Sequence, residues 1–332
     1  MTVRIDKQRI ARLAASAGRV ALNPASHLPK HRGRELSRGE RLLLWFVATG
    51  ICQQTRALEG TVDGVWCRGS DYLTRRLAAH LAAHPAAWTC EALARLGPEE
   101  LAAMVSDDGI GATSTLDRRE ERAHQTRQMA TWLMEEHGGD IERFLPANAA
   151  QDARALLAEL APLEAYEDPL RKKSCLLLMT LEAERLVALD RREAIRLPVD
   201  YHVMRVLLRA GAVVVTNPQR ELRLRLRETV LGYQEEAIRL ACQDAAAEMV
   251  RLGMGLFELD ALLWSVGRNC CRENDAPLCR VGSTCPLKPD RCSLIQSFRY
   301  ACPDACPLES GCASAGKAGA LLNAPVVETH YY

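Results

Sequence analysis

Apolar residues recur at three- and four-residue intervals along most of this chain, which is the spacing of amphipathic helices. Strand-like alternation is confined to short pieces such as residues 212–216, Ala-Val-Val-Val-Thr. The stretch from Arg220 to Arg227 alternates arginine with leucine and resembles a strand, but it leads into Glu and Thr, so its local structure stays open. We therefore predict an all-α class. The later helices are expected at 149–160, 169–189, 199–210, 234–252 and 258–269.

Helix start and stop signals agree with this pattern. Ser37 and Glu40 form a capping-box pair ahead of an apolar run, and Pro98 is suited to the first turn of another helix. Gly138 and Gly139 follow the long helical segment that starts at Asp117. These signals place several boundaries in the first half of the chain.

Length and composition indicate a soluble globular protein of one or two domains. The chain has 332 residues, 48% of them hydrophobic, and no apolar run near the eighteen residues that a membrane span needs. It begins without an apolar signal segment, so we expect a cytoplasmic monomer without a membrane partner. The expected parts are an N-terminal extension (1–34), a helical domain of two interleaved subdomains (35–269), a cysteine-rich metal loop (270–314) and a flexible tail (315–332).

Eight of the 13 cysteines are crowded between Cys270 and Cys312. Soft thiolates at short loop spacings hold structural zinc or an iron-sulfur cluster. Disulfides are disfavoured because no secretion signal is present and a chain of this length needs no disulfide cross-links for stability. One candidate metal set is Cys271, Cys279, Cys285 and Cys292. A second four-cysteine set is Cys270, Cys302, Cys306 and Cys312.

The adjacent pair Lys172 and Lys173 stands out because the chain has only six lysines against thirty-seven arginines. A primary amine at the start of an apolar helix suggests a nucleophile, since burial and a neighbouring cation lower an ammonium pKa. The alternative is an accidental pair at an exposed helix start. Asp200 lies in the first turn of a later helix, where its carboxylate could stabilise positive charge on a sugar or simply cap the helix.

Residues 168–172, Asp-Pro-Leu-Arg-Lys, and 198–201, Pro-Val-Asp-Tyr, carry a family resemblance. A lysine on one helix followed by a Val-Asp-x-His-Val-x-Arg-Val run resembles the helix-hairpin-helix DNA glycosylase superfamily of endonuclease III. The two segments are more similar still to the archaeal 8-oxoguanine DNA glycosylases. The resemblance implies two helical subdomains that flank a base-binding cleft. Asp260 and Trp264 match the family's base-pocket Asp-x-x-x-Trp, and Gln54 matches its base-reading glutamine.

The segment from Gly267 to Cys271, Gly-Arg-Asn-Cys-Cys, is similar to the opening of the 4Fe-4S loop in endonuclease III and MutY-type enzymes. This similarity favours an iron-sulfur cluster over zinc. The family spacing is Cys-x6-Cys-x2-Cys-x5-Cys, whereas the first candidate set has spacings of seven, five and six residues. The cluster would be structural rather than catalytic.

The resemblance implies a DNA glycosylase with AP lyase activity that excises a damaged, 8-oxoguanine-like purine from a flipped nucleotide. One extra residue relative to the family motif makes the alignment of the lysine ambiguous. Lys173 would be the nucleophile in one alignment and Lys172 in the other, and Asp200 would transfer protons. Trp264 would stack on the base, while Asp260 and Gln54 would bind its edge. The family's glycine-rich hairpin is missing before Lys172. Two alternatives therefore stay open: a glycosylase for a modified nucleoside, nucleotide or RNA base, and a noncatalytic iron-sulfur protein that binds nucleic acid.

Overall fold

The computed structural model describes residues 3–20, 34–273, 277–280, 284–296, 301–317 and 321–332. The chain is helix-rich, as the sequence pattern predicts, and the described strands form three two-stranded sheets. It divides into two compact units. We call Ser26–Ile195 with His330–Tyr332 the lysine unit, and Met1–Ala25 with Arg196–Thr329 the cysteine unit. Each is described separately.

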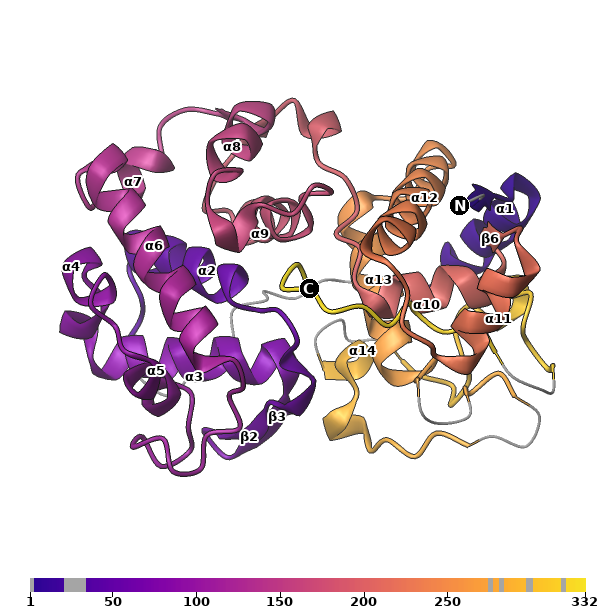
Figure 1. Cartoon of the computed structure of the whole chain (residues 1–332), viewed down its shortest axis with the longest axis horizontal. Helices are drawn as coiled ribbons and strands as arrows, with labels where there is room; N and C mark the ends of the chain where they lie inside the picture. The colour runs from indigo at the N-terminus through magenta and orange to yellow at the C-terminus, as the bar shows by residue number, and fades with distance from the viewer. Residues whose placement is uncertain (1–2, 21–33, 274–276, 281–283, 297–300, 318–320) are drawn as a thin grey trace. The chain divides into compact units, whose positions relative to one another are not determined.

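The lysine unit is built from helices α2 to α9 and two short sheets (Figure 1). Its helices are α2 (Arg38–Gly50), α3 (Gly69–Ala83), α4 (Cys90–Leu93), α5 (Pro98–Met104), α6 (Arg119–His137), α7 (Ile141–Phe144), α8 (Ala153–Leu160) and α9 (Lys172–Ala183). Its strands are β2 (Glu59–Val62) and β3 (Val65–Arg68), which are antiparallel, and β4 (Gln151–Asp152) and β5 (Leu189–Asp190), which are parallel.

The predicted boundaries in the lysine unit are largely confirmed. Ser37 and Glu40 form the capping box of α2, Pro98 is the first residue of α5, and Gly138 ends α6 with a φ of 63°. Helix α9 is shorter than the predicted 169–189, because Arg171 adopts a left-handed conformation with a φ of 56° directly before it. This turn makes Lys172 and Lys173 the first two residues of the helix.

Helix α2 is the central element of the lysine unit, and it packs against α3, α6, α7 and α9. Its buried residues include Leu42, Leu44 and Phe46. At its end, a Cβ on Gly50 would lie 2.6 Å from the Met129 sulfur of α6. The missing Cβ lets the Met129 side chain pack against this end of α2, where the Gly50 carbonyl accepts from Lys173 of α9.

The cysteine unit includes residues near the N-terminus, which the sequence pattern assigned to an N-terminal extension (1–34). Strand β1 (Val3–Ile5) pairs antiparallel with β6 (Val213–Val215), and α1 (Lys7–Ala17) packs on α12. The remaining helices are α10 (Tyr201–Ala210), α11 (Pro218–Leu226), α12 (Gly232–Arg251), α13 (Leu256–Asn269) and α14 (Ser293–Gln296). Residues toward the N-terminus are thus part of the fold of this unit.

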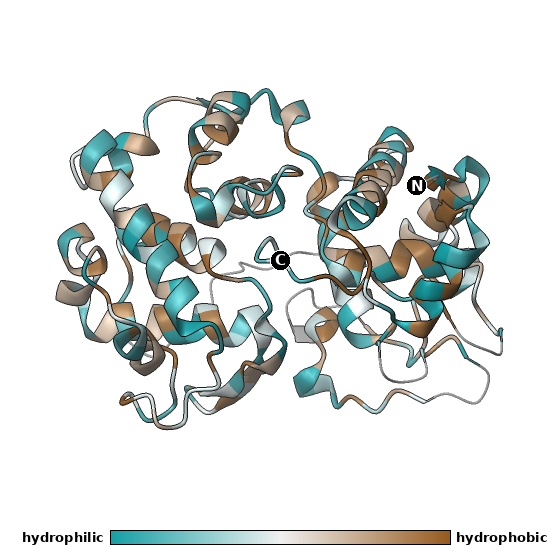
Figure 2. Cartoon of the chain, viewed as in Figure 1, coloured by the Kyte–Doolittle hydropathy of each residue, from teal (hydrophilic) through white to brown (hydrophobic). Residues whose placement is uncertain are grey.

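The Arg and Leu stretch that the sequence left open is helical. Asn217 caps α11, Pro218 occupies its first position and Leu224 is its buried residue. Leu222 and Leu226 remain exposed, 53% and 58% respectively, so the apparent alternation does not mark a strand with one buried face. Helix α12 in the same unit carries both teal and brown residues along its length (Figure 2), as a helix with one packed face does.

Helices α10 and α13 form the most extensive helix pair of the cysteine unit. A Cβ on Gly267 of α13 would lie 2.7 Å from the His202 carbonyl oxygen of α10, so this crossing requires glycine. The close crossing brings the end of α13, where Cys270 and Cys271 follow, against α10.

Candidate functional site

The turn before α9 fixes the position of the two lysines. The Asp168 carboxylate accepts hydrogen bonds from the backbone N–H groups of Leu170, at 3.1 Å, and Lys172, at 2.8 Å. Asp168 is buried, so these bonds replace its contact with water. The Asp-Pro-Leu segment is therefore a rigid turn that starts the lysine helix.

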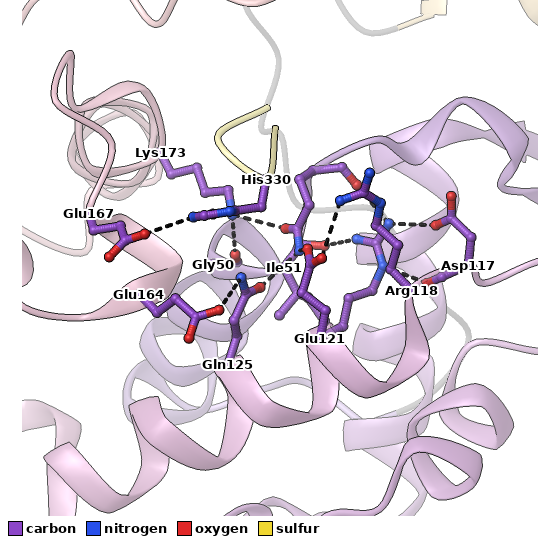
Figure 3. A network of polar contacts seen from close by, with 12 residues as sticks. Gly50, Ile51, Asp117, Arg118, Glu121, Gln125, Glu164, Glu167, Lys173 and His330 are labelled. Carbon is purple, nitrogen blue, oxygen red and sulfur yellow. Dashed lines mark hydrogen bonds and ion pairs between the residues drawn. The ribbon is translucent and has the colours of Figure 1, made fainter. Parts of the chain in front are cut away.

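Lys173 is a buried amine held by two oxygen acceptors. Its Nζ donates to the Gly50 carbonyl at 2.7 Å and to Gln53 Oε1 at 2.9 Å (Figure 3). The residue is only 1% exposed. The exposed-pair alternative is therefore wrong, because a lysine on an ordinary helix face would extend into solvent.

Burial lowers the pKa of Lys173 to about 7. The Cys52 thiol opposes this shift, while the cations of Lys172 and Arg122 add to it. Lys172 thereby acts as the expected neighbouring cation. Close to neutral pH a substantial fraction of such an amine carries a free lone pair, which is the requirement for a nucleophile.

Lys172 has a different environment from its neighbour. It is 7% exposed, and its Nζ lies 3.6 Å from the Cys52 sulfur. Two adjacent residues of one helix point to different partners, the Gly50 carbonyl for Lys173 and the Cys52 thiol for Lys172. Lys173 is thus the more deeply buried of the two lysines and the one whose amine donates to two oxygen acceptors.

Gln53, the neighbour of Gln54, is a buried polar residue that the sequence did not single out. It is fully buried, and its Nε2 donates to Glu121 at 3.0 Å and to Gln125 at 2.8 Å. Arg122 donates to the Gln53 carbonyl at 2.7 Å and to the Ile51 carbonyl. Gln54 takes a left-handed turn instead, with a φ of 49°.

The end of the chain contributes to the lysine unit. His330 Nε2 lies 3.0 Å from the Glu167 carboxylate, one residue before the turn of Asp168 (Figure 3). Tyr332 is 4% exposed. Residues 330–332 are therefore packed into this unit, and no sequence pattern indicated it.

Asp200 is the N-cap of α10 and is 7% exposed. Its Oδ1 accepts from the backbone N–H groups of His202 at 2.8 Å and Val203 at 3.0 Å. Asp200 therefore caps α10, which is the alternative role that the sequence suggested. Its Oδ2 takes no part in these two hydrogen bonds.

Trp264 lies near the start of α10, on the neighbouring helix α13. Its ring makes an edge contact with His202 at 6.1 Å between centroids, and the Arg268 guanidinium carbon lies 4.7 Å from the ring centroid. Trp264 and Asp260 are both half-buried, one helical turn apart. The cysteine unit therefore gathers Asp200 and Trp264, while Lys173 and Gln54 belong to the lysine unit. The pairing of amine and carboxylate stays a prediction.

No disulfide joins the 13 cysteines, all of which lie in the described residues. Arg209 Nη1 donates to the Cys271 sulfur at 3.4 Å, and the Cys312 thiol donates to the Arg209 carbonyl at 3.6 Å. Among the described side chains, no three His, Cys, Asp or Glu already converge on a point that could hold a metal ion. The donor chemistry of eight clustered thiols nevertheless suits a thiophilic metal.

Comparisons with known proteins assign this chain to no family. No protein-family model matches it, and no curated protein is significantly similar to it. Within the described ranges, no helix combines the length and the apolar character needed to cross a membrane.

Proposed function

We propose that this protein is a DNA glycosylase with AP lyase activity that removes a modified, 8-oxoguanine-like purine. The single observation that carries the proposal is the buried amine of Lys173, with a pKa of about 7 and two oxygen acceptors. Keeping a lysine buried costs folding free energy, so such a group marks a functional site more often than a structural one. The resemblance at residues 168–172 and 198–201 supplies the reaction class.

In the proposed arrangement, two helical subdomains of the helix-hairpin-helix glycosylase type flank a cleft that receives a flipped nucleotide. The neutral Lys173 amine attacks C1′ of the sugar, and the base leaves with the bonding electron pair and takes up a proton. The attacking nitrogen then loses a proton and the ring oxygen takes one up, so that the sugar ring opens to a protonated Schiff base. Loss of a proton from C2′ with departure of the 3′ phosphate cleaves the strand, and hydrolysis of the imine releases the amine.

The other residues have distinct roles in this proposal. Asp200 stabilises positive charge on the sugar and carries protons. Trp264 stacks on the base, and Asp260 and Gln54 bind its edge. Gln53 positions the nucleophile, because its amide oxygen accepts from the Lys173 amine and its amide nitrogen is fixed by Glu121 and Gln125.

Borohydride trapping tests the nucleophile directly, because it reduces the Schiff base to a stable covalent adduct with DNA. The full chain should be trapped on a duplex from a panel of purine lesions. We expect K173Q to abolish the adduct and K172Q to retain it. The matched control is K7Q, since the Lys7 side chain is 72% exposed. Trapping that survives K173Q but is lost in K172Q would transfer the role to Lys172.

A second candidate substrate is a free modified nucleoside, nucleotide or RNA base. Acidic side chains gather around the buried lysine, with Glu121 bonded to Gln53, Glu164 to Gln125 and Glu167 to His330. Carboxylates repel a phosphate backbone, so a small substrate with few phosphates suits this surrounding. Cleavage of free nucleosides, without a trapped adduct on any duplex, would establish this alternative. DNA binding without either reaction would leave the noncatalytic nucleic-acid-binding protein.

A further inference from the structure

Arg171, the residue directly before α9, occupies a position where the helix itself disfavours an arginine. We propose that its guanidinium binds the phosphate of the target nucleotide while Lys173 attacks the sugar. This inference rests on the proposed function, because it names the group that holds the phosphodiester at the site of Lys173. The substrate class is therefore a nucleotide within a phosphodiester chain rather than a free nucleoside.

The backbone of Arg171 is strained. Its φ of 56° and ψ of 34° are left-handed, a conformation that costs free energy for a residue with a long side chain. An N-cap residue is normally extended, and its short polar side chain accepts from the helix N–H groups. Arg171 gives α9 no such side-chain cap, and the Asp168 carboxylate accepts from the Lys172 N–H instead. Glycine would therefore suit the backbone at this position better than arginine.

The charge of Arg171 also opposes the helix. The N-terminal end of a helix carries a partial positive charge, so cations are unfavourable there and acidic residues are stabilising. The first turn of α9 contains no acidic residue, and Lys172 and Lys173 directly follow Arg171. Arg171 is therefore a third basic residue at a helix end that favours negative charge. Because this accumulation lowers stability, it indicates a place where the protein binds an anion.

The Arg171 side chain is exposed, whereas both lysines are buried. Its backbone is fixed, because the N–H group donates to the Asp168 carbonyl at 2.8 Å and the carbonyl accepts from the Cys175 N–H at 2.9 Å. Within the part of the chain that the structure describes, the guanidinium makes no ion pair and no hydrogen bond. Its five N–H donors are thus presented to solvent from a rigid backbone.

Arg185, just beyond the other end of α9, is an arginine that its surroundings explain. It is exposed and left-handed like Arg171, with a φ of 56°. However, it lies in the usual turn that ends a helix, where the Leu186 N–H donates to the Leu181 carbonyl at 2.9 Å and a left-handed residue is common. A cation at a helix C-terminus is also favourable. The same residue type and backbone conformation thus have a structural reason at one end of α9 and an electrostatic cost at the other.

Arg171 lies close to the buried amine. It precedes Lys173 by two positions, so their Cα atoms are at most about 7 Å apart. In a nucleotide whose C1′ contacts the Lys173 amine, the phosphodiester is attached on the other side of the sugar and lies nearer to solvent. A guanidinium matches two phosphate oxygens at once in a charge-assisted pair. The partly exposed carboxylates of Glu164 and Glu167, drawn with Lys173 in Figure 3, repel a phosphate, so a nearby exposed cation lets the phosphodiester approach.

Salt-dependent DNA binding and thermal stability together test this role. Affinity of the full chain for a duplex from the purine-lesion panel is measured by fluorescence anisotropy in the K173Q background, in which bound duplex is not consumed. We expect R171G to weaken binding by about 10- to 100-fold and to reduce the slope of log K against log salt by about 0.9, the value of one phosphate contact. R171G should nevertheless melt at the unchanged temperature or about 1–4 °C higher, because glycine removes the strain. The matched control R185G should keep the affinity and the slope.

Unchanged affinity and salt slope in R171G would overturn the inference, and so would an equal loss in R185G. The variant R171K keeps the charge but not the paired donors, so it should keep the salt slope and recover part of the affinity. Failure of the proposed function would appear differently, as a wild-type chain that gives no borohydride adduct on any duplex while R171G still weakens binding. If the wild-type adduct forms and R171G forms it at the same rate with subsaturating duplex, the glycosylase proposal stands and this inference fails.

Discussion

Lys173 and Asp200 are both buried ionisable groups at the starts of helices, but their partners come from different distances along the chain. The Asp200 carboxylate accepts hydrogen bonds from the backbone of the second and third residues after it. The Lys173 amine donates hydrogen bonds to Gly50 and Gln53, which lie more than a hundred positions earlier. A capping aspartate stabilises its own helix wherever it occurs, whereas a buried lysine needs a tertiary framework to hold it. The lysine is therefore the stronger evidence for function.

The largest expected effect would show whether Asp200 is more than a cap. In D200N the amide caps the helix about as well as the carboxylate, so folding should be preserved. Loss of the charge and of proton transfer should slow borohydride trapping by about 10²- to 10⁴-fold. D152N is the matched control, because Asp152 caps α8 through the same kind of bonds to Arg154 and Ala155. Trapping of D200N at the wild-type rate would reduce Asp200 to a structural residue.

The second test uses the pKa of Lys173. In Q53E a carboxylate faces the amine, which should favour the ammonium form and raise the midpoint of the pH–rate profile by about 1–3 units. The adjacent variant Q54E should leave the profile in place, because Gln54 belongs to the next turn. A shift in Q54E and none in Q53E would show that Gln54 is the glutamine that reaches the site.

The third prediction concerns the framework of the lysine pocket. Arg122 is fully buried and donates to the carbonyls of Ile51 and Gln53. R122M should leave both carbonyls without a donor, at a cost in unfolding free energy of about 1–3 kcal/mol for each. Denaturant melts of R122M and of R119M, whose guanidinium is partly exposed, would provide the comparison. Equal stability of the two variants would argue against a framework role for Arg122.

The fourth prediction is a pH dependence of stability. The pKa of Lys173 is about 7 in the folded protein and returns to its ordinary value of 10.5 on unfolding. Between these values the unfolded state binds more protons, so the unfolding free energy should rise with pH, by at most about 1.4 kcal/mol per unit. Below pH 7 both states are protonated and this contribution to the slope vanishes. K173M should lose the rise, and an unchanged slope would contradict the burial of a neutral amine.

The smallest effect is expected at the chain end. The hydrogen bond of His330 with Glu167 is partly exposed, so H330Q should change stability by less than about 1 kcal/mol. Removal of residues 330–332 should have a larger effect, because Tyr332 is buried. If the truncated chain melts like H330Q, the packing of Tyr332 adds nothing to the lysine unit.

The sequence by itself determined the features that depend on neighbouring residues. The capping box of Ser37, the start at Pro98 and the end at Gly138 all follow from local hydrogen bonding and backbone preference. The helical class follows from apolar spacing, whereas the metal chemistry expected of the crowded cysteines stays a prediction. Asp200 belongs to this group, since its cap is made within one turn.

The tertiary structure decided everything that depends on which distant residues meet. It buried Lys173 against the end of α2, placed the Gln53 amide oxygen against its amine and packed His330 beside Glu167. It also drew β1 and α1 into the cysteine unit. The physical reason is that burial and long-range hydrogen bonds depend on the whole fold, whereas local patterns report only what each segment prefers.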